Sequence, residues 1–345
     1  MKKILVTGAA GFIGSQLAHR LWKDGEDVVL LDNFSYGLED NLIFDDVDFR
    51  NEILRVDVRD RKSVLDLFRD NEFDAVYHIA GITPLPDCQM DPAEAVEVNV
   101  MGTVVILEAA RRFGAGKVIF ASTSAVYENN DDFPSVEGHV VPPGLIYPNT
   151  KYSAESFCRS YAETYGMNVT CLRFANVFGP HIDCLRKQPP VLGYLIREFY
   201  FDRSPVLHSS GEQKRDFVYV DDLVDLAVRV QDGTGFDVVN VSTNTVHSIN
   251  EMTEITARAM GKEHIKPSYV TADNYWKKYP ELYEGAYTIS EKALADEVEK
   301  YTCLDNSHAR EKYGWIPRVD FETGIRRTVE FGVEAIERRG GAANG

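Results

Sequence analysis

A tyrosine and a lysine stand four residues apart in the stretch YPNTK, as Tyr147 and Lys151. Positions four apart share one face of a helix, so a phenol and an ammonium would point into the same space. A free phenol has a pKa of about 10 and is a poor base at neutral pH, but a neighbouring ammonium stabilises the phenolate and lowers that pKa. The pair is therefore a candidate general base. Taken alone, the same spacing is more typical of a half-buried tyrosine beside a solvated lysine, and the rest of the sequence must decide.

Three glycines, Gly8, Gly11 and Gly14, fall between an apolar run and a helical pattern in the stretch TGAAGFIG. Glycines at this spacing allow a tight turn, close approach of the backbone to a pyrophosphate, and close helix–strand packing. The helix start then offers free N–H groups to the anion. Asp32 ends the next apolar run, where a carboxylate accepts the ribose hydroxyls of a dinucleotide. A 2′-phosphate would meet like charge there, so the pattern predicts NAD rather than NADP.

The elements that must position these groups alternate along the first half of the chain. Short β-branched runs are followed by helical patterns, which predicts an α/β fold of the Rossmann type, a doubly wound parallel sheet. Ligands of such sheets bind beyond the carboxyl ends of the strands. The predicted strands are 3–7, 27–31, 53–57, 74–79, 117–121 and 168–174, and the predicted helices are 12–24, 60–70, 92–113 and 148–166.

The second half is expected to form a smaller lobe. After Asn176 the alternation weakens, and proline, glycine and aromatic residues become frequent, as in 188–193 and 275–287. We predict an NAD-binding domain over 1–176 and a mainly substrate-binding lobe over 177–345. Two segments near 216–243, namely 216–230 and 237–243, are expected to return to the sheet domain.

Composition excludes several classes of partner. The net charge is −17 and no basic stripe could follow a phosphate backbone, so nucleic acid is not an expected partner. The apolar runs are too short to span a bilayer, and no membrane association is predicted. The five cysteines form no C-x-x-C pair, which disfavours disulfides and a metal site and favours the cytoplasm. They are Cys88, Cys158, Cys171, Cys184 and Cys303.

The glycine spacing G-x-x-G-x-x-G and the Tyr–Lys pair together resemble the extended short-chain dehydrogenase/reductase family. Within it the chain is most similar to the NAD-dependent nucleotide-sugar epimerases and dehydratases. The resemblance covers about residues 3 to 260 and resumes at 311–317. Further matching stretches are LDNFSYG (31–37), HIAG (78–81), NVMGT (99–103), ASTSAVY (121–127), RFANVFGP (173–180) and GEQKRDFVYVDD (211–222).

The resemblance implies where NAD binds. Asp57 and Val58 are expected beside the adenine, and Ala80 and Asn99 near the nicotinamide half. The other implied cofactor residues are Gly8, Gly11, Phe12, Ile13, Gly14, Asp32, Asn33, Tyr147 and Lys151.

The resemblance also assigns catalytic roles. Tyr147 would take a proton from a sugar hydroxyl while a hydride passes to the nicotinamide, whose positive ring favours the phenolate. Lys151 would lower the tyrosine pKa and reach the nicotinamide ribose. Thr123 would hold the reacting hydroxyl in line, with Ser122 and Ser124 as rivals for that role.

The substrate side is implied less completely. Asn176 and Arg215 match positions that contact the substrate diphosphate, and Thr83 and Ser124 are expected to contact the substrate too. Many relatives carry a second phosphate arginine in an R-x-G-D motif, which is missing here. The candidate replacements are Arg310, Lys277 and Lys278, and Thr302 lies where relatives line the edge of the sugar.

These matches predict a nucleotide-sugar 4-epimerase acting on a nucleoside-diphosphate hexose, with a UDP-sugar favoured. The positions after Thr123 are Ser124 and Ala125, whereas dehydratases and decarboxylases carry a carboxylate there. The alternatives are a 4,6-dehydratase, a decarboxylase or a 4-ketoreductase, or a binding protein without turnover. Helices 92–113 and 148–166 are expected to pair across a two-fold axis in a homodimer.

Overall fold

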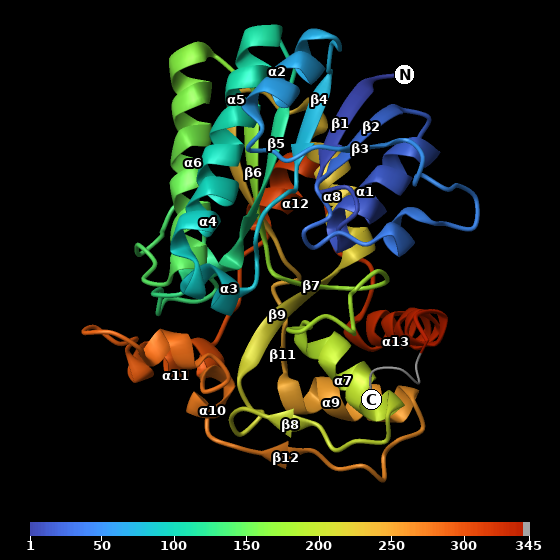
Figure 1. Cartoon of the computed structure of the whole chain (residues 1–345), viewed down its shortest axis with the longest axis vertical. Coiled ribbons are helices and arrows are strands. Elements are labelled where there is room, and N and C mark those ends of the chain that lie inside the picture. Colours follow the sequence, from blue (N-terminus) through green and yellow to red (C-terminus); the bar gives the residue numbers. More distant parts are fainter. Residues whose placement is uncertain (341–345) are drawn as a thin grey trace.

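The core of the protein is a seven-stranded parallel sheet, seen in a computed structural model that describes residues 1–340 (Figure 1). Its strand order β10-β6-β5-β4-β1-β2-β3 reverses direction at β1, which is the doubly wound arrangement expected from the sequence. The predicted α/β Rossmann-type class is confirmed. The strands are β1 (Lys3–Thr7), β2 (Asp27–Asp32), β3 (Ile53–Arg55), β4 (Ala75–His78), β5 (Val118–Thr123), β6 (Val169–Phe174) and β10 (Phe236–Val241).

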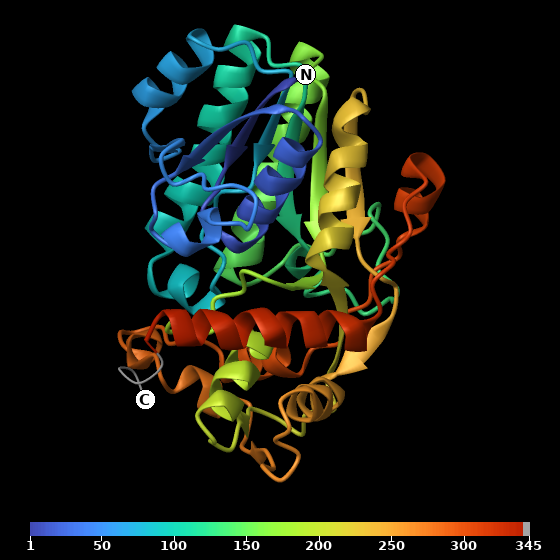
Figure 2. The ribbon, with the colours of Figure 1, turned by 90° about the vertical axis from the view of Figure 1, so that its right-hand side faces the viewer.

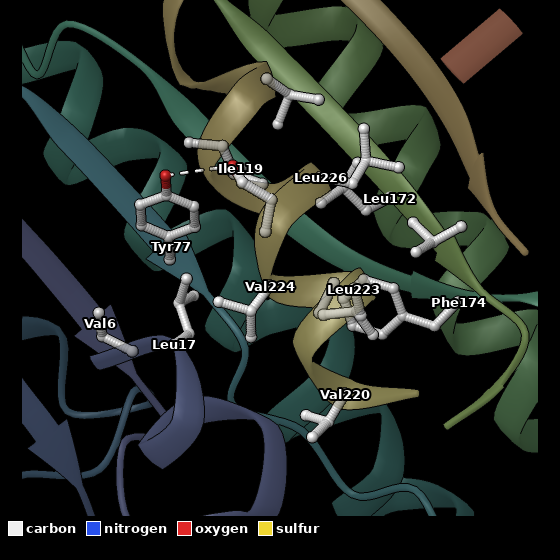
Figure 3. Close-up of a cluster of buried hydrophobic side chains, with 14 of the residues drawn as sticks. Val6, Leu17, Tyr77, Ile119, Leu172, Phe174, Val220, Leu223, Val224 and Leu226 are labelled. Carbon is white, nitrogen blue, oxygen red and sulfur yellow. Dashed lines mark hydrogen bonds between the residues drawn. The ribbon is translucent and has the colours of Figure 1, made fainter. Parts of the chain in front are cut away.

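Helices cover both faces of this sheet because successive strand residues point to opposite sides. Ile4 and Val6 pack with α1 (Phe12–Lys23) and α8 (Val220–Arg229), in the cluster drawn in Figure 3. Leu5 faces the other cluster, formed with α2 (Arg61–Arg69), α5 (Gly102–Phe113) and α6 (Ile146–Tyr165). Both faces are therefore buried, as the unbroken apolar runs of the strands require.

The smaller lobe lies below the sheet domain, and α13 (Phe321–Arg338) runs along it (Figure 2). It has its own apolar cluster, which α13 forms with α7 (Val191–Tyr200) and α9 (Ile249–Ala259). Its strands make a three-stranded and a two-stranded sheet. These strands are β7 (Asn176–Phe178), β8 (Val206–Leu207), β9 (Lys214–Tyr219), β11 (Val246–Ser248) and β12 (Ser268–Tyr269).

Two expectations need correction. Of the segments expected to return to the sheet domain, α8 and β10 do so, but β9 pairs with β7 and β11 in the lobe instead. The predicted helix 92–113 is interrupted: α4 (Pro92–Val96) passes into a π-helical turn, η2 (Glu97–Met101), before α5 begins. The domain boundary at residue 176 stays a prediction.

The remaining elements are short. None of the helices within residues 1–340 is both long enough and apolar enough to cross a membrane. The short remaining elements are η1 (Glu39–Leu42), α3 (Leu85–Met90), η3 (Ser124–Tyr127), η4 (Val230–Asp232), α10 (Asp273–Trp276), η5 (Pro280–Tyr283), α11 (Glu291–Glu299) and α12 (Ser307–Tyr313).

Candidate active site

A cavity of about 740 Å³ lies at the carboxyl ends of the central strands and continues into the lobe. The glycine loop lines one part of it, the Tyr–Lys pair lines the middle, and residues of β8, β9, α10 and α11 line the rest. Most of the predicted site residues therefore meet in one space. They are Gly8, Gly11, Phe12, Ile13, Gly14, Asp32, Asn33, Val58, Ala80, Thr83, Thr123, Tyr147, Lys151, Asn176 and Arg215.

The glycine loop can accept no side chain at its two tightest positions. Gly8 has φ +71°, and a Cβ there would lie 2.7 Å from the Ala80 nitrogen. A Cβ on Gly14 would lie 2.0 Å from the Gly8 carbonyl oxygen. The following helix α1 has no side-chain cap at its first turn, so its N–H groups remain free to bind an anion. The loop thus fits a dinucleotide pyrophosphate.

Asp32 lies at the carboxyl end of β2 with its carboxylate in the cavity. Its oxygens accept hydrogen bonds from the backbone N–H groups of Ala10 (3.0 Å) and Phe34 (2.7 Å). Burial raises the pKa of Asp32, and these backbone hydrogen bonds oppose that rise. A carboxylate has about four acceptor sites, so Asp32 retains capacity for the two ribose hydroxyls of a cofactor.

Two of the predicted cofactor residues do not line the cavity. Asp57 is engaged by Arg59, with an Arg59 Nη2 to Oδ2 distance of 2.9 Å that holds the pKa of Asp57 at about 2. Asn99 is buried on the π-helical turn η2. Its side chain bonds both backbone groups of Ile82 and the Thr150 hydroxyl. Both side chains instead bond within segments that border the cavity: the neighbours of Asp57, Val56 and Val58, line it, and so does Ile82, the partner of Asn99.

Tyr147 lies in the first turn of α6, opposite the end of β5 where Thr123 stands. Burial raises the pKa of Tyr147 to about 12, and the neighbouring Thr123 hydroxyl lowers it. Lys151 is buried one turn later, where its Nζ donates to the Ala121 carbonyl oxygen at 2.9 Å. Burial lowers the pKa of Lys151 to about 8. Tyr147 and Lys151 both line the cavity, so a phenol and a cation face the same bound ligands.

The rivals of Thr123 are placed differently. The Ser122 hydroxyl donates to the Glu155 carboxylate, so its hydrogen is already committed. Ser124 begins η3 and does not line the cavity. Thr123 lines the cavity and its hydroxyl neighbours Tyr147, so it remains our proposed partner of the tyrosine.

On the substrate side, the guanidinium of Arg215 is buried and donates to the carbonyl oxygens of Val298 (2.9 Å) and Glu297 (3.3 Å). Burial lowers the pKa of Arg215 to about 10. Asn176 donates to the Asp216 carbonyl oxygen at 3.0 Å and lines the same space.

The predicted replacements for the missing arginine are mostly misplaced. Arg310 is exposed on α12, bonds Asn306 and does not line the cavity; α12 packs on β10, the edge strand of the sheet. Lys277 is paired with Asp273. Lys278 lines the cavity, whereas Thr302 does not. The sequence reasoning missed other lining residues from three separate segments, which are Arg186, Gln188, His208 and Tyr275.

Comparisons with known proteins agree with this geometry. Residues 4–242 match the model of the NAD dependent epimerase/dehydratase family. The chain is 32% identical to a UDP-glucose 4-epimerase of Mycolicibacterium smegmatis, over 95% of this chain and 98% of that one. It is 28% identical to UDP-glucuronic acid decarboxylase 1 of Danio rerio, over 98% of this chain and 74% of that one.

Among solved structures, a UDP-glucose 4-epimerase of Thermotoga maritima with UDP-glucose superposes with a TM-score of 0.84 at 28% identity. The match covers 97% of this chain and 99% of that chain. The family match spans more than half of the 345 residues and includes the glycine loop, Thr123, Tyr147 and Lys151. The chain therefore belongs to the NAD-dependent epimerase/dehydratase family.

Proposed function

We propose that this protein is a nucleotide-sugar 4-epimerase, acting on a nucleoside-diphosphate hexose with UDP as the favoured nucleotide. One observation carries the proposal. A single cavity joins the glycine loop, the group Thr123, Tyr147 and Lys151, and the buried Arg215. The glycine loop at one end suits a dinucleotide, Arg215 at the other suits a sugar diphosphate, and Tyr147 lines the space as the candidate base.

NAD, when bound, supplies a hydride acceptor beside the sugar and a hydride donor for the return step. Side chains of the protein supply the proton transfer, the orientation of the substrate and the charge that supports the base. Tyr147 takes the proton of the C4 hydroxyl, and the Thr123 hydroxyl keeps that oxygen in line. Lys151 carries the charge that favours the phenolate. The 4-keto sugar then turns within the cleft, and Tyr147 returns the proton when the opposite face is reduced.

The favoured outcome depends on which acids surround the 4-keto sugar. A dehydratase or a decarboxylase needs a further acid or base close to Thr123. Ser124 and Ala125 cannot serve as one. The carboxylates that line the cavity are Asp32, at the ribose end, and Glu297, which Lys300 pairs at 2.6 and 2.7 Å. Asp32 lies with the glycine loop, and Lys300 pairs the charge of Glu297, which supports simple return of the hydride.

The decarboxylase and dehydratase activities are the second candidates, because Glu297 comes from the segment that departs most from the family pattern and still enters the cavity. Incubation with a panel of UDP-, dTDP-, CDP- and GDP-sugars, followed by NMR of the products, separates these candidates. A 4-epimerase yields a C4 epimer without consuming added cofactor, whereas its relatives release water or carbon dioxide.

We also propose a homodimer through α5 and α6, which lie side by side (Figure 1). Met101 at the start of this surface is 56% exposed, and Phe157 on α6 is 42% exposed, while Ala109 is buried in the core. Apolar groups left exposed on adjoining helices suit a partner surface. Light scattering should give twice the mass of one chain, and a monomeric mass would contradict the dimer.

We propose a cytoplasmic location on the basis of the state of the cysteines. All five are buried and unpaired, which suits a reducing compartment.

Replacing Asp32 with alanine is expected to weaken NAD binding by about ten- to a hundredfold. The reason is that hydrogen bonds to a charged group contribute about 1.5–3 kcal/mol. The substitution should also relax discrimination against NADP, whose 2′-phosphate would no longer meet a carboxylate. Fluorescence titrations with NADH and NADPH measure both effects. Asp27→Ala, at the other end of β2, should change neither affinity. Tighter binding of NADP than NAD by the unmodified protein would refute this role.

A further inference from the structure

We propose that Arg186 binds negative charge on the nucleotide sugar, as the second cation that the missing R-x-G-D arginine would otherwise provide. This inference rests on the proposed function, because it names the group that holds the substrate's anion in that same cavity. Arg186 belongs to the segment between β7 and α7, far in sequence from the region where relatives carry the motif. Its side chain lines the cavity.

The guanidinium of Arg186 is largely uncommitted. Its Nε donates to the Gln188 carbonyl oxygen at 2.6 Å. Within residues 1–340, no carboxylate forms an ion pair with it, and its two terminal nitrogens have no hydrogen-bond partner. A guanidinium has five N–H donors in a planar fork, so four remain to bind a phosphate or a carboxylate in bidentate fashion.

The two carboxylates whose charge acts on Arg186 are engaged elsewhere. Asp183 pairs with Arg339 at 2.6 Å. Asp87 accepts hydrogen bonds from the Tyr36 hydroxyl at 2.7 Å and from the Gln188 amide at 2.9 Å. Neither is within ion-pair distance of Arg186, so its charge is not neutralised by the protein.

The same contacts hold Arg186 in place. Gln188 is bonded to Asp87 on α3, and Asp87 is bonded to Tyr36 in the loop after β2. This chain ties the segment that carries Arg186 to the sheet domain. The backbone carbonyl oxygen of Gln188 accepts the hydrogen bond from Arg186 Nε. This contact orients the guanidinium, and with it the remaining N–H donors, before a ligand binds. Such preorganisation reduces the entropy lost on binding.

The electrostatics of the cavity agree with an anion. Burial lowers the pKa of Arg186 below its ordinary value, and the distant Asp183 and Asp87 offset only part of that effect. Arg215 in the same cavity likewise has only backbone carbonyls as partners. A buried cation without a counter-ion is costly, and a bound anion removes that cost. In a protein of net charge −17, two such guanidiniums in one cavity mark an anion site.

The test is equilibrium binding of UDP, UDP-glucose and UDP-glucuronate to the Arg186→Met variant in the presence of NAD. If Arg186 holds the diphosphate, all three should bind about ten- to a hundredfold more weakly. If it holds a sugar carboxylate, only UDP-glucuronate should bind more weakly. Either result supports Arg186 as the anion ligand and identifies which anion it binds. Arg186→Lys, which keeps the charge but not the fork, should lose less.

Arg258→Met is the matched control, because Arg258 is an exposed arginine on α9 of the same lobe and does not line the cavity. Equal affinities for Arg186→Met and Arg258→Met would overturn the inference, as would failure of the unmodified protein to bind any of the three ligands. Unchanged NAD affinity shows that the variant is folded. Binding does not require turnover, so UDP binding through Arg186 without any epimer product would contradict the proposed function alone.

Discussion

Replacing Tyr147 with phenylalanine is expected to lower turnover by about a hundred- to ten-thousandfold, the usual contribution of a positioned general base. The ring would still fill its place in the first turn of α6, so NAD should bind as before. Only the oxygen that takes the C4 proton is lost. Steady-state assays with the active nucleotide sugar give the turnover, and fluorescence titration gives the cofactor affinity.

Tyr152→Phe is the matched control, since Tyr152 lies on the same helix but packs against an apolar cluster of the core and does not line the cavity. It should retain nearly full activity. If the Tyr147 variant kept activity within a few-fold of the unmodified enzyme, the phenol would not be the base, and the catalytic assignment of the whole group would fail.

The second large effect concerns stability. Replacing Arg173 with methionine is expected to cost about 3–5 kcal/mol of unfolding free energy, because one partner of a buried ion pair is removed. Arg173 and Glu155 bond through two contacts of 2.9 and 2.6 Å, and their side chains are only 4% and 6% exposed. The substitution would leave the Glu155 carboxylate buried without its counter-ion. Urea unfolding at a fixed NAD concentration measures the loss.

Two further variants separate the stranded charge from ordinary packing. Adding Glu155→Gln to Arg173→Met should recover part of the stability, because the buried charge is gone. Arg69→Met removes an exposed pair with Asp66 and should cost less than about 1 kcal/mol. If the double variant were less stable than Arg173→Met, the explanation by an uncompensated charge would be wrong.

The sheet could be predicted from the sequence because its signals are local. Each central strand is a short buried run that both faces of a doubly wound sheet require, and β1 was predicted with its observed ends. The run containing β9 looks the same in sequence, but pairing with β7 and β11 decides its sheet, and those partners are distant in the chain. The π-helical turn at Asn99 has no periodic signal in the sequence, and its Asn99 side chain bonds Ile82 and Thr150, which come from other segments.

The site residues likewise fall into two groups, those that a local sequence pattern predicts and those that depend on tertiary contacts. The glycine loop and the Tyr147–Lys151 spacing are local patterns, and the structure places both in the cavity. The Asp57 carboxylate forms an ion pair with Arg59, and the sequence spacing alone does not predict this pairing. Arg310 was predicted from its charge and rough position, while Arg186 depends on Gln188 and Asp87 from separate segments. Charge can be read along the chain, but the direction of a side chain depends on tertiary contacts.

The central claim is return of the hydride to C4, and an isotope label tests it most directly. A UDP-hexose carrying deuterium at C4 is incubated with the enzyme, and the products are analysed by NMR. The account predicts the C4 epimer with deuterium retained at C4, unchanged total nucleotide sugar, and no requirement for added reductant. A 4-keto-6-deoxy sugar, a pentose product, or an epimer that has lost the C4 deuterium would contradict it.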